Sequence, residues 1–134
     1  MTSEDQDRTN ASRTVRVALL ESQLSLGLDM GVSRMMNLLN RSFILRGISG
    51  ISDIDFNSTD VFIIPRIEGP LSITEIEILH DLVAHGVGVL ICVGSECPRK
   101  VRENVNFFLE EYGLSVGFYM YVWSIFIGSI RYGD

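Results

Sequence analysis

The chain has 134 residues, the usual length of one domain and enough to bury a core without disulfides or metal ions. Its apolar share of 46% and charged share of 21% are those of an ordinary globular protein, and no apolar run is long enough to cross a bilayer. Its 11 basic and 17 acidic residues give a formal charge of -6, which argues against binding to nucleic acid or direct insertion into an anionic membrane.

Residues 1–13 are polar and mixed in charge, without the apolar centre of a signal peptide. They predict a flexible N-terminal segment and an intracellular protein. From residue 14 onward, short apolar runs alternate with helical periodicity, which is the pattern of βαβ units. Residues 15–20 predict a first strand, and residues 32–40 predict a helix after a glycine-containing loop.

A second predicted strand, residues 43–45, is cut short by Arg46 and Gly47. Residues 61–64 form an unbroken β-branched and aromatic run, so we expect a strand covered on both faces. Pro65 ends that strand, because proline has no backbone N–H to donate to a sheet.

The next boundary is a capping box, in which Ser72 and Glu75 each satisfy a backbone amide at the start of a helix. Gly86 is placed to end that helix in a left-handed conformation. Its inner face is expected to carry Ile76, Leu79 and Val83, with Ile73 and Leu82 alongside. Residues 87–94 then predict a central strand.

Residues 94–103 read as a polar loop, and Asn104 as the N-cap of a helix that ends at Gly113. A last strand is expected to begin at residues 114–116. The helix has one continuous apolar stripe, formed by Val105, Phe108, Leu109 and Tyr112, with Phe107 beside it. The apolar residues 118–134 have three readings: edge strands, a surface that another chain covers, or a truncated continuation of the fold.

Cys92 lies near the carboxyl end of the central strand, where α/β sheets place their ligand sites. A nucleophile elbow needs a small residue two positions earlier, and Leu90 is there instead. His80 and His85 are on the preceding helix, which runs toward the opposite edge of the sheet. We therefore expect an inert, buried Cys92 and no catalytic, cofactor-binding or metal-binding residues.

Cys97 lies in the polar loop beside Arg99 and Lys100, whose positive charge would lower the pKa of a thiol. We nevertheless favour an exposed loop cysteine without a function, because a reactive thiol also needs a positioned base. Residues 27–31, GLDMG, lack the fingerprint of a dinucleotide or phosphate loop. A pocket near residues 94–97 is expected to be shallow and without converging titratable groups.

Glu110 and Glu111 lie in the last turn of the predicted helix, where the helix dipole is already negative. Folding alone would not select carboxylates there. They are either a solvated acidic face or a contact for basic groups on a neighbouring protein.

The segment NVNFFLEEYGLSV resembles the GIFT domain, which gliding-motility GldG proteins share with the amino-terminal part of intraflagellar transport protein 52. SITEIEILHDLVAHGVGVLICVG is similar to the helix, glycine turn and strand of the same domain. The resemblance covers about residues 15–116 and is strongest from residue 73. The loop GSECPRK and the residues after Gly117 depart from the family.

The resemblance implies one three-layer α/β domain, residues 14–117, with a mostly parallel sheet, related in shape to glutamine-amidotransferase-like and flavodoxin-like folds. It also implies a non-catalytic scaffold of the intraflagellar transport B complex, with other subunits of that complex as partners, in the cilium and at its cytoplasmic base. The residues expected to contact partners are Asn104, Asn106, Glu110 and Glu111. Two alternatives are an amidotransferase-like or hydrolase-like enzyme that uses Cys92, and an accessory domain of a gliding-motility-type transporter.

Overall fold

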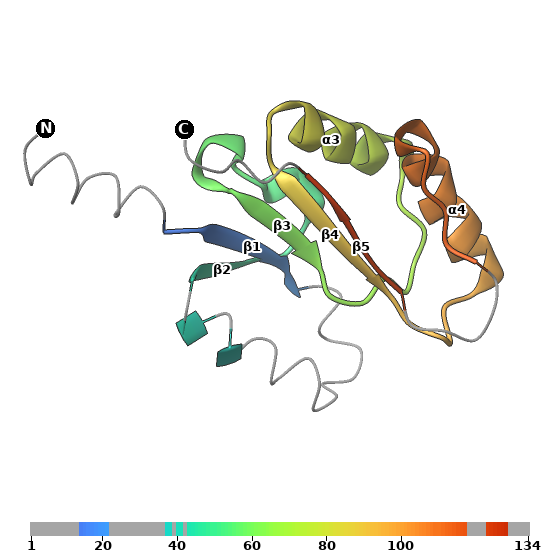
Figure 1. Ribbon diagram of the computed structural model, residues 1–134, viewed down its shortest axis with the longest axis horizontal. Coiled ribbons are helices and arrows are strands. Elements are labelled where there is room, and N and C mark those ends of the chain that lie inside the picture. The colour runs from blue at the N-terminus through green and yellow to red at the C-terminus, as the bar shows by residue number, and fades with distance from the viewer. Residues whose placement is uncertain (1–13, 22–36, 39, 42, 118–122, 129–134) are drawn as a thin grey trace, which may run out of the picture.

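The computed structural model describes residues 14–21, 37–38, 40–41, 43–117 and 123–128. Within them, five strands form one sheet in the order β2-β1-β3-β4-β5 (Figure 1). The strands are β1 Arg16–Leu20, β2 Ile44–Ile48, β3 Val61–Ile64, β4 Gly88–Val93 and β5 Trp123–Ile127. The first four run parallel, and β5 pairs antiparallel with β4. The predicted α/β class with a mostly parallel sheet is confirmed.

Two helices, α3 (Ile73–Ala84) and α4 (Arg99–Leu109), lie on the same face of the sheet (Figure 1). The main core fills the space between them and the strands, and Phe62, Leu79 and Phe108 are fully buried there. A smaller buried cluster on the opposite face comprises Val17, Leu19 and Ile63. Apolar burial on both faces of the sheet is consistent with the predicted three-layer architecture.

Two predictions fall mainly on residues outside the described ranges. Nothing in the structure tests the expected flexibility of residues 1–13. Of the helix expected over residues 32–40, residues 37, 38 and 40 are helical, as is residue 41.

Helix α3 forms as its local sequence predicts. The Ser72 hydroxyl accepts from the Glu75 backbone N–H at 3.1 Å, and the Glu75 carboxylate accepts from the Ser72 N–H at 2.9 Å. Gly86 follows the helix with φ of 91°, a conformation that side-chain-bearing residues rarely adopt. The prediction that Ile73 lies alongside the inner face was wrong, because this side chain is 76% exposed. At 100° per residue it lies roughly 110° around the helix from the middle of the inner stripe.

The second strand is longer than predicted. Residues Arg46 and Gly47 do not end it, and it continues to Ile48 in parallel register with β1. Strand β2 is at the edge of the sheet, where polar and small residues are tolerated because one side faces solvent. The side chain of Glu21 lies in the space that a Cβ atom at Gly47 would occupy.

Two boundaries around α4 were predicted wrongly. The helix begins at Arg99, with Pro98 as its N-cap residue, so Asn104 is in the helix interior and is not an N-cap. Val101 extends the buried stripe back by one turn, and that spacing was the missed signal. Residues 114–116 form no strand. The inner stripe itself is confirmed, since Val105, Phe108 and Leu109 are buried.

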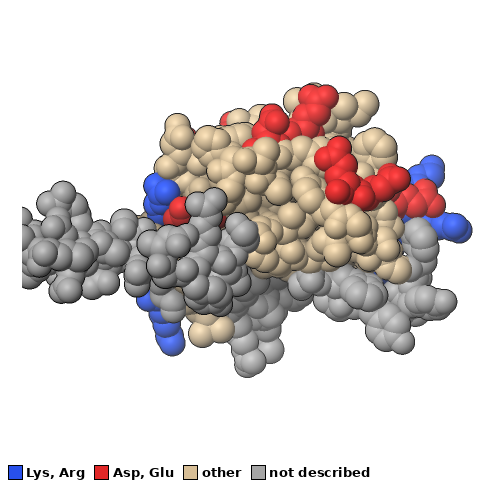
Figure 2. Space-filling view, turned by 45° about the horizontal axis from the view of Figure 1, so that its top comes forward, with Lys and Arg blue, Asp and Glu red and all other residues tan. Residues whose placement is uncertain are grey.

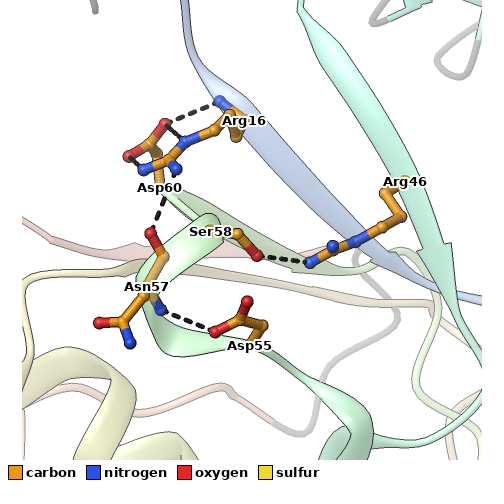
Figure 3. Close-up of polar contacts among 6 residues, drawn as sticks. All are labelled: Arg16, Arg46, Asp55, Asn57, Ser58 and Asp60. Carbon is orange, nitrogen blue, oxygen red and sulfur yellow. Dashed lines mark hydrogen bonds and ion pairs between the residues drawn. The ribbon is translucent and has the colours of Figure 1, made fainter.

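A polar network joins β1 to the loop before β3 at the amino edge of the sheet (Figure 3). The Arg16 guanidinium donates to both carboxylate oxygens of Asp60, at 3.0 and 3.1 Å, and the Arg16 backbone N–H donates to the same carboxylate at 2.8 Å. Arg16 also donates to the Asn57 carbonyl, and Arg46 donates to Ser58. The pKa of Asp60 lies below its ordinary value, chiefly because its carboxylate accepts hydrogen bonds from the Arg16 side chain.

Replacing Asp60 with Asn is expected to lower the free energy of unfolding by about 1 kcal/mol at pH 7, a modest figure because both side chains are about 40% exposed and screened. A carboxyl whose pKa is lowered by folding stabilises the protein above its unfolded pKa of about 3.9. The difference between the wild type and Asp60→Asn should therefore shrink as the pH falls below 4. Urea titrations from pH 3 to pH 7 measure it, with Asp81→Asn on the exposed face of α3 as control. A difference independent of pH would contradict this account.

Candidate functional site

The carboxyl edge of the sheet is where a nucleophile would be expected in this architecture. Along β4, Ile91 and Val93 join the helix-side core, so the intervening Cys92 points to the other face. His80 is on α3 and His85 is the C-cap residue of the same helix, which packs on the opposite face of the sheet. The structure separates the Cys92 sulfur from both imidazoles, as the sequence predicted. Cys92 is half-buried rather than fully buried.

The same edge is closed by the side chain of Arg102, which sequence reasoning missed. It projects from α4, is only 3% exposed, and donates to the carbonyl oxygens of Gly94, Ser95, Cys97 and Gly117 at 2.7 to 3.2 Å. A guanidinium has five N–H donors in a fixed planar fork, which suits several carbonyls at once. Arg102 thus joins the loop after β4 to the segment after α4.

A cavity of about 230 Å³ lies beside this loop, lined by residues that include Arg66, Glu68, Glu96 and Cys97. Arg66 is 3.1 Å from Glu68 and 3.8 Å from Glu96, so titratable groups do converge here and the contrary prediction was wrong. The Arg66 side chain is thus paired with both carboxylates that line the cavity.

The thiol of Cys97 is at the same place and is half-buried. Burial raises the pKa of Cys97 above its ordinary value and outweighs the opposing effect of Arg102. This direction is opposite to the less favoured alternative, in which Arg99 and Lys100 lower the pKa of Cys97. The thiol stays protonated near neutral pH, and a protonated thiol is a poor nucleophile.

Asn104 and Asn106 were predicted to contact partners, and the structure shows what their amides bond within the chain. Asn104 accepts from the Leu71 N–H at 2.6 Å and donates to the Leu71 carbonyl at 3.0 Å. Asn106 makes the same two bonds, at 2.6 and 3.0 Å, with Val116. Each asparagine amide thereby satisfies both the N–H and the carbonyl of one backbone residue, as an adjacent strand does in a sheet. The two asparagines fix the chain segments on either side of α4.

Glu110 and Glu111 form the 3-10 turn, Glu110–Tyr112, that follows α4 and ends at Gly113 with φ of 70°. His80 Nδ1 lies 2.8 Å from the Tyr112 hydroxyl and 3.3 Å from a Glu111 carboxylate oxygen. Burial raises the pKa of Tyr112, and Glu111 adds to the effect. The carboxylate of Glu111 at the negative end of α4 thus has a neighbour on α3.

The outer side of α4 carries a hollow of about 470 Å³ between the helix and the segment that follows it. We call it the α4 groove; residues within 103–115 line it, among them Glu103, Phe107, Glu110 and Leu114. Phe107 is 63% exposed and Leu114 is 42% exposed, although both are large and apolar. Figure 2 shows acidic side chains gathered over the helical layer of the molecule, with basic side chains at its margins.

Two absences hold for the part of the chain that the structure describes. No helix there combines the length and hydropathy needed to span a membrane. No set of three or more His, Cys, Asp or Glu side chains there is arranged to hold a metal ion.

Comparison with known proteins gives one match. The model of the IFT52 GIFT domain family matches residues 28–127, about three quarters of the chain. The match extends through β5, so the resemblance does not end near Gly117 as the sequence reading expected. No curated protein and no solved structure matches the chain. The chain belongs to the IFT52 GIFT domain family, which connects it with intraflagellar transport.

Proposed function

We propose that this chain is a non-catalytic scaffold domain of the intraflagellar transport B complex, acting in the assembly and maintenance of cilia from the cytoplasmic base and within the cilium. The family match over residues 28–127 is the observation that carries the proposal. The matching family is the intraflagellar transport branch rather than the gliding-motility branch of the GIFT domain.

The geometry of the carboxyl edge supports a role without catalysis. A cysteine nucleophile needs a positioned base, and the described histidines lie across the sheet from Cys92. The other thiol at that edge, Cys97, has a raised pKa. The guanidinium of Arg102 donates hydrogen bonds to backbone carbonyls of the loop after β4. This loop lies where an enzyme of this architecture would bind its substrate.

Membership of the complex is tested by expressing the affinity-tagged full chain in ciliated cells. The expected result is co-purification with other subunits of the intraflagellar transport B complex and enrichment at the ciliary base and along the cilium. The tag alone is the control. Diffuse cytoplasmic distribution without recovery of any subunit would remove the proposal.

We further propose that partners contact the exposed surface of α4 and of the turn that follows it, where Asn104 and Asn106 hold the flanking segments and Glu110 and Glu111 supply charge. The double variant Glu110→Lys and Glu111→Lys is expected to reduce recovery of partner subunits. The matched control is Glu77→Lys with Asp81→Lys, two exposed acids of α3 with the same change in net charge. Equal recovery from all three proteins would take these acids out of the interface.

Thiol labelling distinguishes the scaffold proposal from the enzyme alternative. The rates expected for a non-catalytic scaffold are as follows. The rate at which iodoacetamide labels Cys97 should rise about tenfold per pH unit from pH 6 to pH 8.5, because only the thiolate reacts and the pKa of this thiol is raised. Half-buried Cys92 should label slowly until the protein is unfolded. Mass spectrometry of each cysteine-containing peptide measures both rates. Rapid labelling of Cys92 below neutral pH would favour a nucleophile.

A further inference from the structure

The α4 groove presents apolar surface that the described part of the chain leaves exposed. Phe107 and Phe108 are adjacent in α4, yet Phe108 is fully buried and Phe107 is 63% exposed beside Leu114. Contact of apolar side chains with water is unfavourable. A partner that covers Phe107 and Leu114 would gain about 25 cal/mol per Å² of apolar area buried. The groove has room for one or two apolar side chains of a partner.

The walls of the groove are held at a fixed separation. One wall is α4, and the other is the segment after Gly113. The amide of Asn106, on α4, accepts a hydrogen bond from the Val116 N–H at 2.6 Å and donates one to the Val116 carbonyl at 3.0 Å. Binding to a surface that is already ordered loses less conformational entropy than binding to a loop that must first be ordered. The groove is therefore shaped before any partner arrives.

The charge at the groove is negative. Glu103 and Glu110 are among its lining residues, and none of the lining residues within the described ranges is Lys or Arg. Glu110 also lies at the carbonyl end of α4, where the helix dipole adds further negative potential. Glu103 is 3.2 Å from Arg99, but exposed ion pairs of this kind add little to stability. A cation of a partner can therefore compete with Arg99 for the Glu103 carboxylate. Negative charge repels nucleic acid and anionic lipid and favours a basic occupant.

We propose that the α4 groove binds a basic amphipathic segment of a partner protein. Its apolar side chains pack against Phe107 and Leu114, and its Lys or Arg side chains pair with Glu103 and Glu110. The inference rests on the proposed scaffold function and names the chemistry of the partner. It also accounts for the acidic end of α4, because carboxylates that oppose the helix dipole there are matched by the cations of the bound segment.

The direct test uses the purified full chain and two fluorescent peptides. One is an amphipathic peptide of leucine and lysine, and the other has glutamate at every lysine position. The lysine peptide should bind and the glutamate peptide should not. Phe107→Ala and Glu110→Lys should each weaken binding of the lysine peptide about tenfold, since buried aromatic and paired charged residues carry most interface energy. Added salt should weaken it further.

The matched controls are Ile73→Ala and Glu77→Lys, which remove an exposed apolar side chain and reverse an exposed acid on α3. They should leave the Kd within about twofold, and unchanged thermal midpoints will show that all four variants fold. The groove proposal is overturned if the control variants weaken binding of the lysine peptide as much as the groove variants do. It is also overturned if both peptides bind equally. The same outcome leaves membership of the transport complex standing.

Co-purification from ciliated cells separates the two proposals. Recovery of subunits by the wild type and by Ile73→Ala and Glu77→Lys, with loss for Phe107→Ala and Glu110→Lys, supports the groove. Equal recovery by all five proteins overturns the groove and keeps the scaffold function. If the wild type recovers no subunit, the scaffold function fails, and the peptide titration alone decides whether the groove binds basic segments.

Discussion

Replacing Arg102 with Met is expected to lower the free energy of unfolding by about 3 kcal/mol, because it leaves up to four backbone carbonyls without their donors. Those carbonyls belong to Gly94, Ser95, Cys97 and Gly117, in two segments that this side chain bridges. Arg102→Lys should recover part of the loss, since an ammonium keeps the charge but cannot reproduce the planar fork.

The control for Arg102→Met is Lys100→Met, which removes the same charge from an exposed position of α4 two residues away. Its free energy of unfolding should stay within about 0.5 kcal/mol of the wild type. Urea denaturation followed by circular dichroism measures both. If the two variants lose the same stability, the bonds from Arg102 to the loop contribute nothing and the closure of the sheet edge has another cause.

Replacing Phe108 with Ala is expected to lower the free energy of unfolding by about 3–5 kcal/mol, because this side chain is fully buried between α4 and the sheet. Its ring centroid lies 4.8 Å from that of His80 and 5.5 Å from that of Tyr112, so the variant also removes two ring contacts. These contacts join α3 to the end of α4. Their loss should loosen the packing of the two helices against each other.

The neighbouring Phe107→Ala is the matched control, with the same atoms removed from an exposed position. It should change the free energy of unfolding by less than about 0.5 kcal/mol while weakening the binding of basic segments. The pair separates folding from recognition within two consecutive residues. Thermal and urea denaturation of both variants measures the difference, and a larger loss for Phe107→Ala than for Phe108→Ala would reverse the assignment of inner and outer faces.

The fold was predicted best where local signals agree with each other. Ser72, Glu75 and Gly86 define α3 because a capping box and a left-handed glycine act within a few residues of chain. Strand β3 and the inner stripe of α4 followed from hydrophobic runs that suit burial. The separation of Cys92 from the histidines was predicted from the direction of the preceding helix, and the structure adds that Cys92 points to the other face of the sheet.

The errors arose where a distant contact outweighs a local preference. Asn104 has the composition of an N-cap, yet its amide pairs with Leu71, 33 residues away in the sequence. Arg46 and Gly47 read as breakers, yet pairing with β1 keeps them in a strand. Charged residues 99–103 read as a loop, yet Val101 and Arg102 are buried against the sheet.

The candidate groove shows the same division. Periodicity placed Glu110 and Glu111 at the end of a helix and raised the question of what their charge meets, and it placed Phe107 beside the buried stripe. It did not reveal that Leu114 returns alongside Phe107, because that requires the bonds from Asn106 to Val116.

Short-range chemistry therefore set the class of the fold, the main elements and the faces that they bury, since caps, alternation and helical spacing act over a few residues. Long-range packing set which exposed groups share a surface, because the closing of one segment on another depends on contacts between residues far apart in the chain. The α4 groove and the closure by Arg102 belong to the second kind.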